Sequence, residues 1–107
     1  MSAKLEYGNG NIRVRFTGEI DHHAASLLRV SIDSAIAQHR PKTLILDFSG
    51  VTFMDSSGVG LVMGRYRSVS AYGGKVEAVN LPPRLYQIMK LSGLEKIAGL
   101  RMAGERP

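Results

Sequence analysis

Apolar residues recur every two residues in some segments of this chain and about every 3.6 residues in others. This alternation limits the possible folds more than any other feature. Ile12, Val14 and Phe16 alternate with polar neighbours, as in a strand with one buried face. Residues 43–48 read TLILDF, a short run typical of a central strand covered on both faces. Each of these two segments is followed by one in which apolar residues recur every three or four positions, as on one face of a helix. Strands that alternate with helices predict right-handed crossovers and a largely parallel sheet.

The first half of the chain shows clear boundaries between its elements. Residues 8–10 read GNG, a turn of the kind that joins hairpin strands, and a weak strand at 4–7 precedes it. We expect Gly18 to end the second strand. Asp21 can cap a helix, because its carboxylate accepts from free N–H groups of the first turn. Pro41 stops that helix.

The second half repeats the alternation. Residues 49–55 form a connection, and helical spacing resumes at about Ser57. The remaining elements are a strand at 75–79, a helix begun by Pro82 and Pro83 and closed by Gly93, a possible strand at 97–100 and a frayed tail at 102–107. The order is ββαβαβα with a possible final strand. All 107 residues fit a single α/β domain, with a mostly parallel sheet and a hairpin at one edge.

Each predicted helix has one apolar face, read from residues three or four positions apart. These faces are Ala25, Leu28, Ile32, Ala35 and Ile36 in the first helix, Val59, Val62, Met63, Tyr66 and Val69 in the second, and Leu85, Ile88 and Met89 in the third.

Composition narrows the class of function. The chain has no cysteine, which excludes a disulfide framework, a thiolate metal site and a cysteine nucleophile. Its net charge is +5, but the basic residues are scattered and not interleaved with aromatics, so the pattern does not favour nucleic acid as a partner. No segment has the apolar length of a membrane span, and the N-terminus has no apolar run of a secretory signal. We therefore expect a cytoplasmic protein with no membrane partner.

Enzymatic and metal chemistry have little support. His22 and His23 are adjacent, and successive helical residues point about 100° apart, so they cannot easily share one metal ion. Ser56 and Ser57 do not lie in a G-x-S-x-G motif, because Met54 stands where the first glycine would be. A chain of 107 residues also leaves little room for a substrate pocket beside its core. We predict no catalytic residue and no metal site.

Three glycines, Gly58, Gly60 and Gly64, superficially resemble a dinucleotide fingerprint. In such a fingerprint the glycines come almost directly after the strand, and an acidic residue lies about 20 positions further on. The first condition fails here, because nine residues lie between Phe48 and Gly58. Glycines that let a helix approach the sheet closely are a sufficient explanation, and nucleotide binding is the alternative.

The segment Asp55-Ser56-Ser57-Gly58 lies where the second helix begins. Aspartate and serine are strong capping residues, so the residues alone favour a structural cap. A helix N-terminus also has free N–H groups and a partial positive charge, which suit a phosphate. The position is therefore chemically suited to a phosphoserine, although suitability alone does not select that function.

Three stretches of the chain resemble one known family. FMDSSGVG at 53–60, continuing through Gly64-Arg65-Tyr66, closely resembles the signature of the STAS-domain anti-anti-sigma factors. TGEIDHHA at 17–24 is similar to the family's segment before its first helix, and LSGL at 91–94 to its late-helix exit. The nearest resemblance is to the sporulation anti-sigma factor antagonists, the SpoIIAA type, whose element order is the one predicted above.

The resemblance implies partner switching. The unphosphorylated antagonist binds an anti-sigma factor and frees a sigma factor. The anti-sigma factor is also a serine kinase, and it phosphorylates the antagonist to end the interaction. A metal-dependent phosphatase of the PP2C type restores the binding form. The acceptor that the resemblance assigns is Ser56. ATP and magnesium would belong to the kinase, and the chain itself would need no cofactor and have no catalytic activity.

Turns from strand to helix gather at the carboxyl ends of parallel strands, so we expect Asp21 to lie on the same edge of the sheet as Ser56. We infer that a partner binds at this edge. The expected members of this partner-binding surface are Asp21, Asp55, Ser57, Gly58 and Arg65. Simple capping is the alternative for Asp21 and a solvated charge the alternative for Arg65.

Two features depart from the family pattern. The chain is strongly basic, and it ends soon after its last possible strand, so that a final helix is expected to be short or missing. Two alternatives to the antagonist remain, namely a STAS scaffold subunit of a signalling assembly and a small domain that binds nucleotides or nucleic acid.

Overall fold

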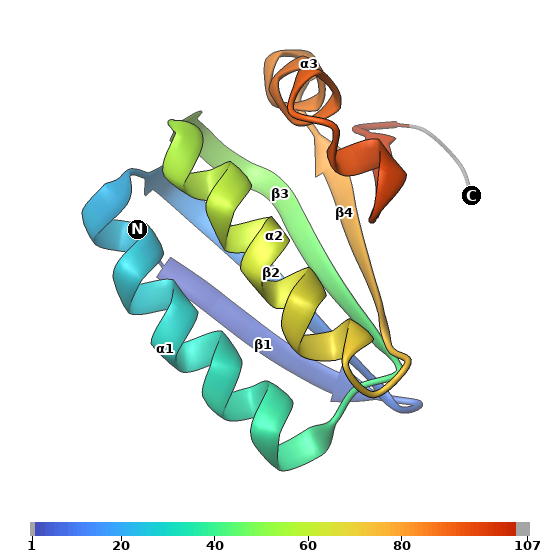
Figure 1. Ribbon diagram of the computed structural model, residues 1–107. Helices are drawn as coiled ribbons and strands as arrows, with labels where there is room; N and C mark the ends of the chain where they lie inside the picture. Colours follow the sequence, from blue (N-terminus) through green and yellow to red (C-terminus); the bar gives the residue numbers. More distant parts are fainter. Residues whose placement is uncertain (1, 105–107) are drawn as a thin grey trace.

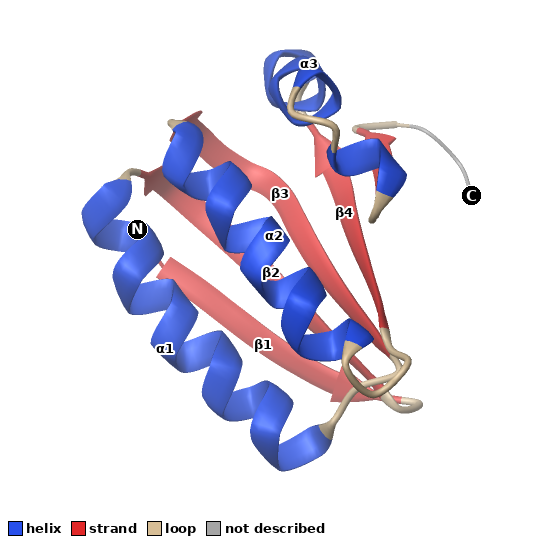
Figure 2. Cartoon of the chain, in the orientation of Figure 1, coloured by secondary structure: helices blue, strands red, loops and turns tan. Residues whose placement is uncertain are grey.

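The computed structural model describes residues 2–104, which form one five-stranded sheet and three α-helices (Figures 1 and 2). In chain order the elements are β1 (Ser2–Gly8), β2 (Asn11–Ile20), α1 (His22–His39), β3 (Thr43–Met54), α2 (Ser56–Ser70), β4 (Lys75–Leu81), α3 (Pro83–Leu91), a short 3₁₀ helix η1 (Leu94–Lys96) and β5 (Gly99–Met102). The predicted order is confirmed, including the final strand. Residues 105–107 of the predicted tail lie outside the described residues.

The sheet is mixed, as predicted. Its strand order is β1-β2-β3-β4-β5. β1 and β2 pair antiparallel, whereas the other three pairings are parallel. The hairpin turn between β1 and β2 uses Asn9 and Gly10, whose φ angles are 54° and 79°. Asparagine and glycine tolerate such positive φ angles, which the tight turns of hairpins require.

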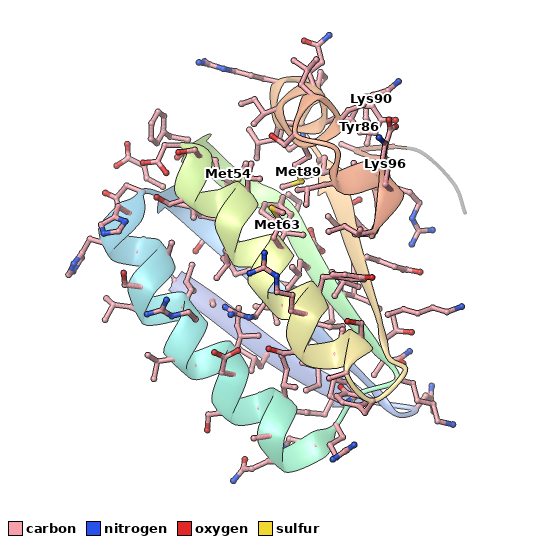
Figure 3. The ribbon with its side chains drawn as sticks, viewed as in Figure 1. Met54, Met63, Tyr86, Met89, Lys90 and Lys96 are labelled. Atoms are coloured by element: carbon pink, nitrogen blue, oxygen red, sulfur yellow. The ribbon has the colours of Figure 1, made fainter. Side chains whose placement is uncertain are left out.

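The helices α1 and α2 lie side by side against one face of the sheet (Figure 1). The main core fills the layer between these two helices and the sheet. It includes Phe16 and Phe48, whose ring centroids are 5.1 Å apart. α3 comes after β4, and Met89 packs from α3 toward α2, where Met63 contacts the same core (Figure 3).

The opposite face of the sheet is polar, and Asp47 lies at its centre. The side chain of Asp47 is 1% exposed and accepts two hydrogen bonds from Arg13, at 3.2 and 2.8 Å. It also accepts from the Ser49 N–H at 3.0 Å and from the Asn80 side chain at 3.1 Å. Burial alone would raise the pKa of Asp47, but these hydrogen bonds outweigh it and lower the pKa below its ordinary value. One carboxylate thus ties β2, β3 and β4 together.

This polar face corrects one expectation. β3 was expected to be covered on both faces. Leu44, Leu46 and Phe48 are fully buried, but Ile45, on the other face, is only half-buried. Apolar burial on both faces is therefore wrong for this strand, because helices α1 and α2 cover only one of them.

Two strand boundaries were also wrong. β2 continues past Gly18 to Ile20, and β3 continues past Phe48 to Met54. The two strands stay paired beyond two register shifts, and Gly50 lies so close to β2 that a Cβ there would be 2.7 Å from the Phe16 carbonyl oxygen. Glycine therefore permits the close approach that extends the pairing.

The predicted buried face is confirmed at four of its five positions in α1, and at Leu85 and Met89 in α3, whereas the buried face of α2 is rotated from the one predicted. In α1, Ala24 is buried and Ala25 only half-buried. In α2 the buried residues are Gly58, Leu61, Val62, Arg65 and Val69, whereas Val59, Met63 and Tyr66 are half-buried against the core. Because α2 packs on both α1 and the sheet, its buried surface includes positions that an amphipathic pattern assigns to solvent.

Candidate functional site

The turns that lead into α1 and α2 lie next to each other at the carboxyl ends of β2 and β3 (Figure 1). Ile20 and Met54, the last residues of the two strands, are direct partners in the parallel pairing. The Asp55 N–H donates a hydrogen bond of 3.3 Å to the Ile20 carbonyl, which links the two turns. The prediction that Asp21 and Ser56 share one edge of the sheet is confirmed.

An aspartate caps each of the two helices. Asp21 precedes α1 with φ −95° and ψ −175°, and its Oδ1 accepts from the Ala24 N–H at 2.8 Å. Asp55 precedes α2 with φ −99° and ψ −171°, and its Oδ1 accepts from the Ser57 N–H at 2.8 Å. The capping predicted for Asp21 is confirmed, and Asp55 has the same role. Each carboxylate satisfies one N–H group that the first helical turn leaves free.

Ser56 is the first residue of α2, and its side chain is exposed. Within residues 2–104, no hydrogen bond of the structure uses its hydroxyl group. The cap that the segment was expected to supply is therefore the Asp55 carboxylate and not this serine. The hydroxyl lies at the positive end of a 15-residue helix, where a phosphate is electrostatically tolerated.

Gly58 is buried in the first turn of α2, and it adds no side chain to the surface. A Cβ at this position would lie 2.3 Å from both Cγ and Sδ of Met54, which packs beneath the first turn of α2 (Figure 3). By contrast, a Cβ at Gly60 or Gly64 would meet no atom within 4 Å. The interpretation that glycines allow close packing is confirmed for Gly58 and wrong for the other two.

Arg65 is not a solvated charge. It is 5% exposed, and its Nε lies 3.0 Å from Oδ1 of Asp33 on α1. Burial lowers the pKa of Arg65, the Asp33 charge raises it and the Arg29 charge lowers it further. Its ion pair joins α1 to α2, so its first role is structural.

A groove between α1 and α2 opens next to the two turns, with a volume of about 240 Å³. The side chains that matter for its chemistry are His22, Ser26, Arg29, Ser57 and Arg65. Ser57 and Arg65 were predicted site residues, whereas Ser26 and Arg29 were missed. The sequence did contain a pattern that groups them, since residues 22, 26 and 29 share one face of a helix. The sequence contained no sign of which helix that face would meet.

Phe53 is a further exposed residue near this edge. It is 44% exposed and pairs with Glu19 of β2, two residues before Asp55. Exposed aromatic residues are common where proteins bind one another. The residue lies inside the motif on which the resemblance was based, but its exposure depends on the extension of β3.

The described residues, 2–104, also bear on metal binding and on membrane insertion. In that part of the chain there is no group of three or more His, Cys, Asp and Glu side chains able to hold a metal ion. Nor does any described helix have the length and apolar character needed to cross a membrane.

Comparisons with known proteins agree with this geometry. An anti-sigma F factor antagonist of Paenibacillus polymyxa is 33% identical over 97 residues, which cover 91% of this chain and 83% of the relative. The structure of the anti-sigma factor antagonist SpoIIAA in its unphosphorylated form is similar with a TM-score of 0.82 and 37% identity, over 92% of this chain and 87% of that one. The Bacillus cell fate determinant SpoIIAA in the phosphorylated form is similar with a TM-score of 0.75 and 37% identity, over 92% and 90% of the two chains.

The family model for the STAS domain matches residues 3–103. That range includes every strand and helix from β2 to β5, both capped turns and the groove between α1 and α2. The resemblance read from the three sequence stretches is confirmed, and the chain belongs to the STAS domain family.

Proposed function

We propose that this protein is an anti-sigma factor antagonist controlled by phosphorylation, with Ser56 as the acceptor. The observation that carries the proposal is the exposed, unbonded hydroxyl at the first position of α2, next to a second capped turn. Similarity to SpoIIAA structures in unphosphorylated and phosphorylated forms supports it.

The unphosphorylated chain binds an anti-sigma factor and thereby releases a sigma factor in the cytoplasm. The same partner is a serine kinase, and ATP and magnesium are bound there. In the transfer step a bond forms between Ser56 Oγ and the γ-phosphorus of ATP, the bond to the leaving ADP oxygen breaks, and the serine proton passes to a base of the kinase. A PP2C-type phosphatase later hydrolyses the phosphoserine. The chain itself is a ligand and a substrate, not an enzyme.

The electrostatics explain how one phosphate can end binding without unfolding the protein. The group adds about −1.5 to −2 charges. At the N-terminus of α2 this charge meets the positive end of the helix, so the fold tolerates it. In an interface the same charge must be desolvated, beside the carboxylate of Asp55, and that is unfavourable.

The partner-binding surface includes Asp21, Asp55, Ser57 and the exposed ring of Phe53. Gly58 and Arg65 act from beneath this surface. Gly58 lets α2 approach Met54, and Arg65 holds α2 against α1 through Asp33. The shape of the surface therefore depends on two residues that a partner scarcely touches.

The test is intact-mass spectrometry with site mapping, after incubation of the protein with ATP and a candidate anti-sigma serine kinase. We expect one phosphate on Ser56, and loss of the complex on a sizing column. Ser56→Ala should keep partner binding and accept no phosphate, whereas the matched variant Ser57→Ala should still be phosphorylated. Phosphate on Ser57, or a complex that survives modification, would contradict the proposal.

A further inference from the structure

The groove between α1 and α2 contains more positive charge than its surroundings balance. Arg29 and Arg65 both line it, and both are cations. Asp33 is 3.0 Å from Arg65, but none of the ion pairs within residues 2–104 includes Arg29. One carboxylate therefore faces two guanidinium groups.

The hydrogen bonding of Arg65 is incomplete as well. Its side chain is 6% exposed, and its Nη1 atom is buried without a hydrogen-bond partner among the described residues. A buried donor that lacks a partner is unfavourable, and more so when it carries charge. Arg65 thus has binding capacity that the protein's own described groups do not use.

The rest of the groove has the same electrostatic character. It runs beside the N-terminal turns of α1 and α2, because His22 and Ser57 both line it. Helix N-termini carry partial positive charge, and two of them meet here. The Ser57 hydroxyl can donate to an anion, whereas the Ser26 hydroxyl already donates to the His22 carbonyl at 3.1 Å.

The size of the groove limits what it can hold. Its volume is about 240 Å³. Sites for drug-sized ligands are larger, about 300–1,000 Å³. A whole nucleotide is therefore too large to be enclosed, and a single compact anion is the better match.

We propose that the groove between α1 and α2 binds a small oxyanion of the phosphate class, held by the guanidinium groups of Arg29 and Arg65. Arginine pairs with such oxyanions through two parallel hydrogen bonds, which are among the stronger interactions in proteins. The bound anion balances the second positive charge and stabilises the contact between the helices. Ser56 itself does not line the groove, although its neighbour Ser57, a member of the partner-binding surface, does.

The experiment is an NMR titration of the full ¹⁵N-labelled chain with inorganic phosphate at constant ionic strength, with chloride as the reference salt. We expect saturable shifts of the amide signals of Ser26, Ser57 and Gly60. A parallel titration with glycerol 3-phosphate separates the two sources of this chemistry. Saturation by both means that the site accepts a phosphate on a larger molecule, and saturation by inorganic phosphate alone means that it takes the free ion.

Two matched variants distinguish a site from general charge attraction. Arg29→Gln and Arg67→Gln each remove one exposed positive charge, but only Arg29 lines the groove. We expect Arg29→Gln to weaken phosphate binding about tenfold, as loss of a charge-assisted hydrogen bond does. Arg67→Gln should leave binding unchanged. Shifts that do not saturate, or that fall equally in both variants, would overturn the proposal.

Arg65 is best tested with a conservative substitution, because it also holds the two helices together. Arg65→Lys keeps the charge and loses the planar fork, so we expect a folded protein with weaker phosphate binding. Ser56→Ala should bind phosphate as the parent protein does. Failure of the kinase experiment with retained phosphate binding would therefore reject the switch alone, and the reverse result would reject the groove alone.

Discussion

The two turns at the carboxyl ends of β2 and β3 have nearly the same backbone and differ in the residues that come after the cap. Asp21 and Asp55 have φ angles within a few degrees of each other, and each accepts one N–H group of its helix. After the first cap the chain continues His-His-Ala, and after the second Ser-Ser-Gly. The two turns therefore distinguish helix capping from a second role, although the sequence places both in the same short segment. The aspartates are explained by helix capping, whereas the exposed Ser56 is not.

The difference extends to the third residue of each helix. Ala24 in α1 and Gly58 in α2 are equivalent positions, and both are buried. The first turn accommodates a methyl group, whereas in the second Met54 occupies the space where that methyl would lie. The second turn is thus packed more tightly against the strand before it.

The largest expected difference between the turns is in phosphoryl transfer. In Ser56→Ala, we expect no phosphate from the proposed kinase partner. Adding His22→Ser to that variant places a serine at the equivalent position of the first turn, and we expect no recovery, since the kinase must recognise more than a capped helix start. Intact mass after incubation with ATP measures both. Phosphate on residue 22 would show that turn geometry alone makes an acceptor.

An aspartate outside both turns gives the largest expected effect on stability. Asp47→Ala leaves Arg13 without its buried partner, and we expect a loss of about 3 kcal/mol in urea unfolding. Because the folded pKa of Asp47 lies below its ordinary value, its stabilising effect is complete above about pH 4 and is lost as the pH falls through the folded pKa. The variant should therefore show a weaker dependence of stability on pH in that acid range.

The matched control is Glu6→Ala, which removes an exposed ion pair with Arg15. It should change stability little. An Asp47→Ala variant no less stable than Glu6→Ala would show that the polar face does not hold the strands together.

Substitutions at the third residue of each helix should differ in their effect on stability, because the two positions are packed differently. Gly58→Ala is expected to cost about 1–3 kcal/mol, because Met54 must move out of a buried position. Ala24→Gly in the other turn should cost about 1–2 kcal/mol, through helix propensity and the loss of one buried methyl group. Thermal unfolding measures both. If Gly58→Ala were as stable as the parent, the tight packing under the second turn would be refuted.

The smallest expected difference is between the caps themselves. Asp21→Ala and Asp55→Ala should each lower stability by about 1 kcal/mol, because each leaves one N–H group of the first turn without a partner. Asp→Asn at either position should retain most of that stability, since the amide oxygen also accepts. Unequal losses in chemical unfolding would break the equivalence of the two turns.

Features that depend on near neighbours in the chain were predicted well. The Asn9-Gly10 turn, the cap at Asp21, the stop before Pro41 and the order of strands and helices all arise from local backbone preferences. Ser56 was proposed as the acceptor through a resemblance to a family that the STAS match confirms, although the residues alone favoured capping at that segment. A capping pattern and an acceptor pattern use the same residue types, so local chemistry could not separate them.

Features that join residues distant in the chain could be seen only in the folded protein. β2 and β3 extend beyond their predicted ends because they remain paired with each other. Gly50 makes the close approach of the two strands possible. Arg65 is buried because Asp33 of α1 lies beside it, and Arg29 joins the same groove from that helix. The elements, their order and their caps were readable from the chain alone, since hydrogen bonds within a turn or helix join near neighbours. The pairing of α1 with α2, and the charged groove between them, required contacts between residues that no local pattern relates.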